Sequence, residues 1–98
     1  MYRKSSTWAR WKWRYFFLSG TELLCYESDQ SRPKEDLKGV IYLATESGTQ
    51  FPVYPEPLRG RPYTFVIENP SKNWYLDPVT DVEQQRWLLI LQNCVRKV

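Results

Sequence analysis

The sequence has no histidine and only two cysteines among its 98 residues. Histidine is the side chain that changes charge near neutral pH and the commonest metal ligand, so its absence removes the usual proton-transfer group of an enzyme. The chain also has no cluster of metal-ligating residues, no glycine-rich phosphate loop and no nucleophile placed beside a base. These absences predict a non-catalytic domain that uses neither a metal nor a cofactor.

Cys25 and Cys94 are too few for the disulfide framework of a small secreted domain. Cys25 falls in an apolar, strand-like run and Cys94 on the apolar side of a predicted helix, so we expect two small, buried, free thiols. The chain shows no signal peptide, no apolar run of eighteen residues and no lipidation motif. The sequence therefore predicts a cytoplasmic module whose membrane contact is peripheral.

The net charge of +3 is unevenly distributed along the chain. Residues 1–18 hold five cations and no acid, whereas the remaining 80 residues hold nine cations and eleven acids. A local basic patch on a nearly neutral body favours a focused anionic partner. Single-strand nucleic-acid binders also alternate basic and aromatic residues, but the charge balance of the rest and the lack of an RNA-binding motif argue against nucleic acid.

Residues 11–18 read WKWRYFFL, and this aromatic run without glycine or proline predicts a strand. Alternation along a strand places Lys12, Arg14, Phe16 and Leu18 on one face. Because unpaired cations are costly to bury, we expect Phe16 and Leu18 inside the domain and the two cations at its open mouth. Two parallel cations at a rim suit an anionic ligand, and arginine can bind phosphate through two hydrogen bonds.

The other face of the same strand is aromatic and carries Trp11, Trp13, Tyr15 and Phe17. An exposed apolar patch of this kind usually marks an interface. The alternative is that flanking residues or a bend in the strand cover these rings. Trp8, in the loop beside Arg10, is a candidate for insertion among lipid head groups.

The chain places short strands first and a helix last. Further strands are predicted at residues 2–4, 22–26, 39–43, 51–54, 63–68 and 74–76. Turns or loops are predicted at 5–10, 19–21, 29–36 and 69–73, with irregular structure over most of 44–62. One helix after seven strands predicts a bent antiparallel sheet that the helix closes.

The helix is predicted to begin at about Asp81, because Thr80 and Glu83 have the spacing of a capping box. Its expected apolar stripe follows Trp87 and consists of Leu88, Ile90, Leu91, Cys94, Val95 and Val98. An interfacial membrane helix is the alternative use of this stripe, but strands this short need a cap for their core.

Taken together, these segments resemble a pleckstrin homology (PH) domain. The matching pieces are residues 11–18, LLCYE at 23–27, KGVIYL at 38–43, YTFVI at 63–67, and Trp87 in the final helix. The resemblance covers nearly the whole chain and implies a single domain over residues 1–98, which we expect to be a module of a larger protein. The fold it implies is mainly β, with a seven-stranded, partly open barrel capped by one C-terminal α-helix.

The resemblance also implies a ligand. Members that bind phosphoinositides use a lysine at the end of the first strand and two basic residues on the second, and these positions match Lys4, Lys12 and Arg14. Arg10, in the intervening loop, could reach the same ligand. The implied partners are phosphoinositides or other anionic lipids, with recruitment of a signalling protein to the cytoplasmic membrane face. The alternative is a protein-interaction module with weak, non-specific affinity for anionic membranes.

Selectivity is expected to be modest. Members that favour trisphosphorylated lipids usually add a tyrosine on the third strand, and Cys25 stands at that position. A thiol is a poor hydrogen-bond donor to phosphate.

Overall fold

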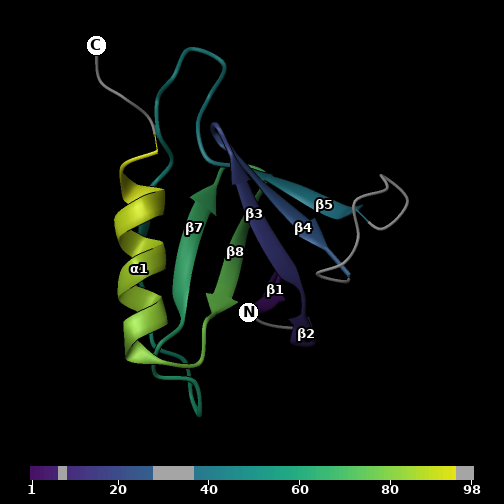
Figure 1. Ribbon diagram of the computed structural model, residues 1–98, viewed down its shortest axis with the longest axis vertical. Helices are drawn as coiled ribbons and strands as arrows, with labels where there is room; N and C mark the ends of the chain where they lie inside the picture. Colours follow the sequence, from purple (N-terminus) through teal and green to yellow (C-terminus); the bar gives the residue numbers. More distant parts are fainter. Residues whose placement is uncertain (7–8, 28–36, 95–98) are drawn as a thin grey trace.

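The computed structural model describes residues 1–6, 9–27 and 37–94. Within these ranges the strands are β1 Tyr2–Lys4, β2 Lys12–Trp13, β3 Tyr15–Ser19, β4 Glu22–Tyr26, β5 Leu37–Tyr42, β6 Val53–Pro55, β7 Phe65–Asn69 and β8 Lys72–Asp77, followed by helix α1 Asp81–Gln92. They form a five-stranded antiparallel sheet, in the order β2-β1-β8-β7-β6, and a three-stranded one, β3-β4-β5. The helix contacts β6, the edge strand of the larger sheet, and stands to one side of the strands in the view of Figure 1. This architecture confirms the predicted fold class.

The run predicted as one continuous strand is divided at Arg14. Its first part, β2, is an edge of the larger sheet, and its second part, β3, is an edge of the smaller sheet. The Arg14 N–H donates to the Met1 carbonyl at 3.1 Å, and the Met1 nitrogen donates to the Arg14 carbonyl at 2.9 Å. Pairing with β1 therefore continues as far as Arg14, where the chain turns the corner from one sheet into the other.

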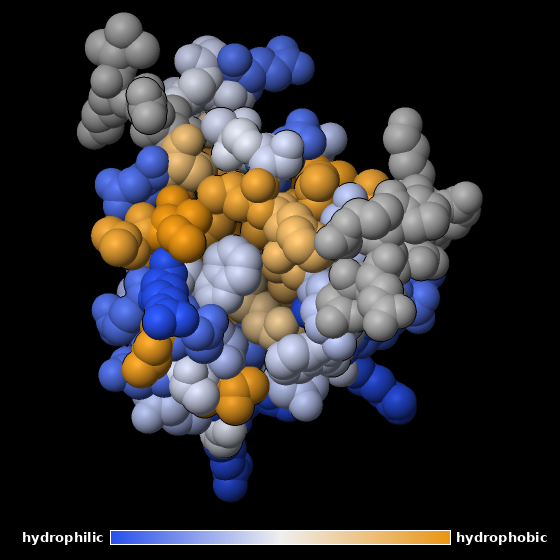
Figure 2. Space-filling view, viewed as in Figure 1, coloured by the Kyte–Doolittle hydropathy of each residue, from blue (hydrophilic) through white to orange (hydrophobic). Residues whose placement is uncertain are grey.

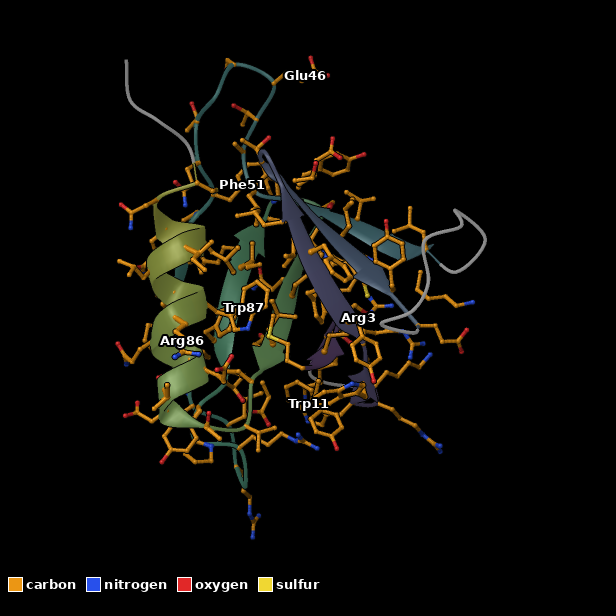
Figure 3. The ribbon with its side chains drawn as sticks, viewed as in Figure 1. Arg3, Trp11, Glu46, Phe51, Arg86 and Trp87 are labelled. Carbon is orange, nitrogen blue, oxygen red and sulfur yellow. The ribbon has the colours of Figure 1, made fainter. Side chains whose placement is uncertain are left out.

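Side chains from both sheets and the helix meet in one core. Its buried members are Met1, Leu23, Ile41, Leu43, Val53, Phe65, Ile67, Leu76, Leu88 and Leu91. Phe16 and Trp87 are partly buried against this core, with ring centroids 6.4 Å apart in an edge-to-face contact. Figure 3 shows Trp87 projecting from α1 toward the strands. The predicted interior position of Leu18 is wrong: it is 36% exposed, because β3 is an edge strand that pairs only with β4.

The helix begins as predicted. The Thr80 hydroxyl oxygen accepts a hydrogen bond from the Glu83 N–H at 3.2 Å, which satisfies one of the free donors of the first turn. Leu88 and Leu91 are buried, whereas Ile90 is 46% exposed, contrary to the expected stripe. Two residues along an α-helix correspond to a rotation of about 200°, so Ile90 cannot share the buried face of Leu88. The expected stripe members Val95 and Val98 lie outside the described residues.

The strand boundaries follow the turn residues. Gly20, with φ of 60°, makes the hairpin turn between β3 and β4, in a backbone conformation that glycine adopts without strain. The predicted turn at 69–73 is shorter than expected, because Asn69 and Lys72 already pair across the hairpin. The Asn69 side-chain oxygen accepts from the Ser71 N–H at 3.0 Å and closes this turn. The predicted loop at 29–36 lies outside the described residues.

Both cysteines are free thiols, as expected. Cys25 is fully buried, and Cys94 is half-buried. Burial raises the pKa of each thiol above its ordinary value, because the thiolate would lose its hydration.

Candidate anion-binding site

A cavity of about 280 Å³ lies at the β1–β2 end of the domain. The residues that line it are Arg3, Lys4, Ser5, Ala9, Arg10 and Lys12. Four of the six carry a positive charge and none carries a negative charge. We call this site the basic cavity. Its chemistry suits an anion with several oxygen atoms, such as a phosphate group.

The pairing of β1 with β2 explains why two of these cations converge. Arg3 stands directly opposite Lys12 in the register, and opposed residues of an antiparallel pair extend from the same face. The next opposed residues on that face are Met1 and Arg14, and Met1 belongs to the buried core. Arg3 and Lys12 therefore lie on the inner face of the β1–β2 pair, at its open end.

Lys4, which the resemblance matched to the first-strand lysine, occupies the opposite face of β1. Its ammonium nitrogen lies 4.8 Å from the centroid of the Trp11 ring and 6.0 Å from that of Tyr75. Lys4 still lines the basic cavity, but the inner-face cation is Arg3, which was not among the residues predicted from the sequence. A signal was present: Met1 is apolar and two residues from Arg3, so alternation from a buried Met1 points to Arg3.

Arg14 is not among the residues that line the cavity. Its guanidinium Nη1 donates to the Trp13 carbonyl at 2.8 Å. The Nε atoms of Arg3 and Arg14 are both buried and have no hydrogen-bond partner. Burial raises the pKa of the Cys25 thiol, and the positive charges of Arg3 and Arg14 oppose that rise.

Arg10 and Lys12 are exposed. The ion pairs within the described ranges are Lys38–Glu27, Arg61–Asp77 and Arg86–Glu83. In this part of the chain, no carboxylate therefore forms an ion pair with a cation of the basic cavity. Trp8, the predicted membrane-inserting residue, lies outside the described residues.

The outer face of β1 and β2 is held by a cation from another part of the chain. The Arg61 guanidinium carbon lies 4.6 Å from the centroid of the Tyr2 ring and 4.5 Å from that of Trp11. The same guanidinium donates to a carboxylate oxygen of Asp77, which is only 4% exposed, at 2.8 Å. Flanking residues thus cover part of the aromatic face, which was one of the two alternatives derived from the sequence.

The covering is incomplete. Trp13 and Phe17 remain exposed, and Leu89 and Ile90 are exposed on α1. Figure 2 shows apolar side chains gathered across the upper middle of one face, over α1 and β3. This surface offers apolar area to a partner in addition to the charged cavity.

The fold and the site together define a small β domain with a cationic cavity between its first two strands. The family model of the PH domain matches residues 1–96, and the chain belongs to this family. PH domains are modules that commonly mediate lipid or protein interactions and are typically non-catalytic. A comparison with curated proteins returned no match.

In the described ranges, no helix is long and apolar enough to cross a membrane. The same ranges contain no group of three or more side chains that could hold a metal ion.

Proposed function

We propose that this domain is a non-catalytic module that binds phosphoinositide head groups in the basic cavity and so recruits its parent protein to the cytoplasmic face of a membrane. The observation that carries the proposal is the charge of the cavity: four of its six lining residues are cations, and none is an acid. A phosphorylated inositol ring offers several anionic oxygens to such a site.

The arrangement of the donors supports a pocket in addition to a charged surface. Arg3 and Lys12 approach from opposed positions on two strands, so their spacing is fixed by the backbone pairing. Arg10 extends the cationic lining into the loop between the strands. The Nε of Arg3 is a buried donor without a hydrogen-bond partner, and a phosphate that reached it would satisfy a group that is costly to leave unpaired.

Charge attraction adds affinity that does not depend on the pocket. Each cation near an anionic membrane surface contributes about 1 kcal/mol, so the cations of the cavity together favour membrane association even before a head group enters. The pocket is needed for the choice among lipids, since a head group with more phosphates meets more donors.

The test is a titration of the protein with soluble inositol phosphates, followed by amide chemical shifts. We expect the largest shifts at Arg3, Lys12 and the residues between them. Lys12→Ala should weaken binding at least about tenfold, since a hydrogen bond to a charged group contributes about 1.5–3 kcal/mol. Arg86→Ala removes the same charge from α1 and serves as the matched control; equal losses in both variants would contradict a pocket.

Protein interaction is the second candidate function, and the exposed apolar side chains of Leu89 and Ile90 favour it. This function predicts that inositol phosphates shift many surface amides slightly and none strongly. It also predicts that vesicle binding depends on total lipid charge and not on the kind of head group.

A further inference from the structure

A second cavity, also of about 280 Å³, lies where β2 and β3 meet the start of α1. Four of its lining residues are aromatic: Trp13, Tyr15, Phe16 and Trp87. Glu83 is the one charged side chain in the lining. We call this site the aromatic cavity. Its chemistry is the reverse of the basic cavity, because it offers ring faces and a negative charge.

The four rings form two edge-to-face pairs. Trp13 and Tyr15 have centroids 6.2 Å apart at 84°, and Phe16 and Trp87 have centroids 6.4 Å apart at 76°. None of the four is fully buried, so a ligand can reach them. The faces of aromatic rings carry partial negative charge and attract cations.

These rings differ from the other aromatic residues near the N-terminal strands. Lysine or arginine groups lie over the rings of Tyr2, Trp11, Trp74 and Tyr75. Within the described ranges, none lies over the four rings of the aromatic cavity. Among the described residues, the protein's own cations therefore lie over one set of rings and not over the other.

Glu83 gives the aromatic cavity a preference for positive charge. Its backbone N–H is fixed by the Thr80 cap, which holds the residue in the first turn of α1. One carboxylate oxygen accepts from Arg86 Nη1 at 3.2 Å. This pair lies on the helix surface, where such pairs contribute little, so the carboxylate can still stabilise a bound cation.

We propose that the aromatic cavity binds a quaternary ammonium group, the choline head group of phosphatidylcholine. A trimethylammonium presents methyl groups to the rings and needs no hydrogen bond, whereas a primary ammonium would need several acceptors and finds one carboxylate. That the choline group belongs to a lipid rests on the proposed function, in which the basic cavity binds a lipid head group. Trp13 directly follows Lys12, so the same two-residue strand, β2, contributes one residue to each cavity.

The first experiment titrates the protein with choline and follows the indole N–H signals. We expect shifts of Trp13 and Trp87. The uncharged carbon analogue of choline, in which a tert-butyl group replaces the trimethylammonium, should bind at least about threefold more weakly, as expected for loss of a partly exposed cation–π contact. Equal binding of the two compounds would show a merely apolar hollow and overturn the proposal.

Two variants assign the effect to the cavity. Glu83→Gln keeps the backbone cap and the length of the side chain but removes the charge, so it should lower choline affinity about threefold or more. The matched control is Glu46→Gln, at the tip of the β5–β6 loop far from α1's first turn (Figure 3), which should change nothing. Trp13→Ala should abolish the choline shifts of Trp87. Unchanged choline binding in Glu83→Gln or Trp13→Ala would overturn the assignment.

The last experiment tests the lipid source. Phosphatidylcholine and phosphatidylethanolamine vesicles with equal phosphoinositide content are compared, and Glu83→Gln should weaken binding only to the former. A trimethyl-lysine peptide that binds while phosphatidylcholine vesicles give no difference would overturn the lipid assignment. Lys12→Ala should leave choline binding in solution intact, so failure of the basic cavity and failure of the aromatic cavity give distinguishable results.

Discussion

The cations on the two faces of the β1–β2 pair differ in whether they already have partners within the fold. On the outer face, Arg61 is held between the rings of Tyr2 and Trp11 and bonded to the buried Asp77. On the inner face, Lys12 is exposed and has no ion-pair partner within the described residues. The outer cation is part of the fold, whereas the inner one is available to a ligand.

The difference shows why counting positive charges does not locate a binding site. A cation that already has a carboxylate and two ring faces gains little from an added anion. A cation without these partners exchanges only water for the ligand. The comparison therefore predicts that changes on the outer face affect the free energy of unfolding, and that changes on the inner face affect ligand affinity.

The largest effect is expected from Arg61→Gln. Asp77 would lose its cationic partner while staying buried, and it also accepts from the Val79 N–H at 2.8 Å in the turn that leads into α1. Breaking a buried pair costs about 3–5 kcal/mol, and the partial exposure of Arg61 places the expected loss near about 3 kcal/mol. Chemical unfolding measures this loss.

The matched control is Arg59→Gln, which removes the same charge from an exposed position in the same turn. Its free energy of unfolding should change by less than about 0.5 kcal/mol. Similar unfolding midpoints for the two variants would refute the structural role of Arg61.

The next effect is expected from Arg3→Gln. This change removes an inner-face donor opposite Lys12, and we expect about tenfold weaker binding of inositol phosphates. The guanidinium carbon of Arg3 also lies 5.1 Å from the centroid of the Trp74 ring. Loss of this cation–π contact should lower the free energy of unfolding by about 0.5–1 kcal/mol. Calorimetric titration well below the unfolding temperature separates affinity from stability. If the variant bound inositol phosphates with wild-type affinity, Arg3 would not be part of the binding site.

A smaller effect on affinity is expected from Lys4→Gln. Lys4 lines the basic cavity but extends from the outer face, over Trp11 and Tyr75. Replacing Lys4 removes the attraction of one charge but no hydrogen bond from the inner face, so a loss of about fivefold is expected, which corresponds to about 1 kcal/mol for one cation near an anionic surface. If Lys4→Gln weakened binding more than Arg3→Gln, the assignment of the two faces would be reversed.

The smallest effect is expected for selectivity, that is, for the difference in affinity between phosphoinositides. Cys25 is fully buried and pairs with Phe16 and Gly39 in the sheet, so it contributes no hydroxyl donor to a ligand. We expect less than about tenfold preference among phosphoinositides of equal charge, with affinity that falls as salt rises, because exposed charges are screened over about 8 Å at physiological ionic strength. Vesicles matched in total charge test this at two salt concentrations. A strong preference for one lipid that persists at high salt would contradict it.

Most of the fold followed from local patterns. The strand β4 has the predicted bounds, and the Thr80 cap begins α1 at the predicted residue, because turn glycines and capping oxygens act within a few residues. The division of residues 11–18 into two strands at Arg14 was not predicted, since no glycine, proline or other turn residue stands there. It depends on Met1 pairing with Arg14 while the next residues pair with β4.

The structure brings three of the predicted site residues together, and their binding role stays a prediction. Lys4, Arg10 and Lys12 do line one cavity, as their density in the first residues indicated. Arg14 does not line it, whereas Arg3, which was not among the predicted site residues, lines it from the inner face. Spacing along the chain gives the faces of one strand, but the face that lies inward depends on which residue meets the core.

By itself, the sequence determined the order of strands, the helix with its cap, the basic character of the first eighteen residues and the free thiols. These properties depend on residue types and on contacts a few positions apart. The tertiary structure decided which cations are available: Arg61 and Asp77 are distant in sequence from Tyr2 and Trp11, yet they meet on one face. The aromatic cavity likewise exists only because α1 brings Glu83 and Trp87 to the rings of β2 and β3.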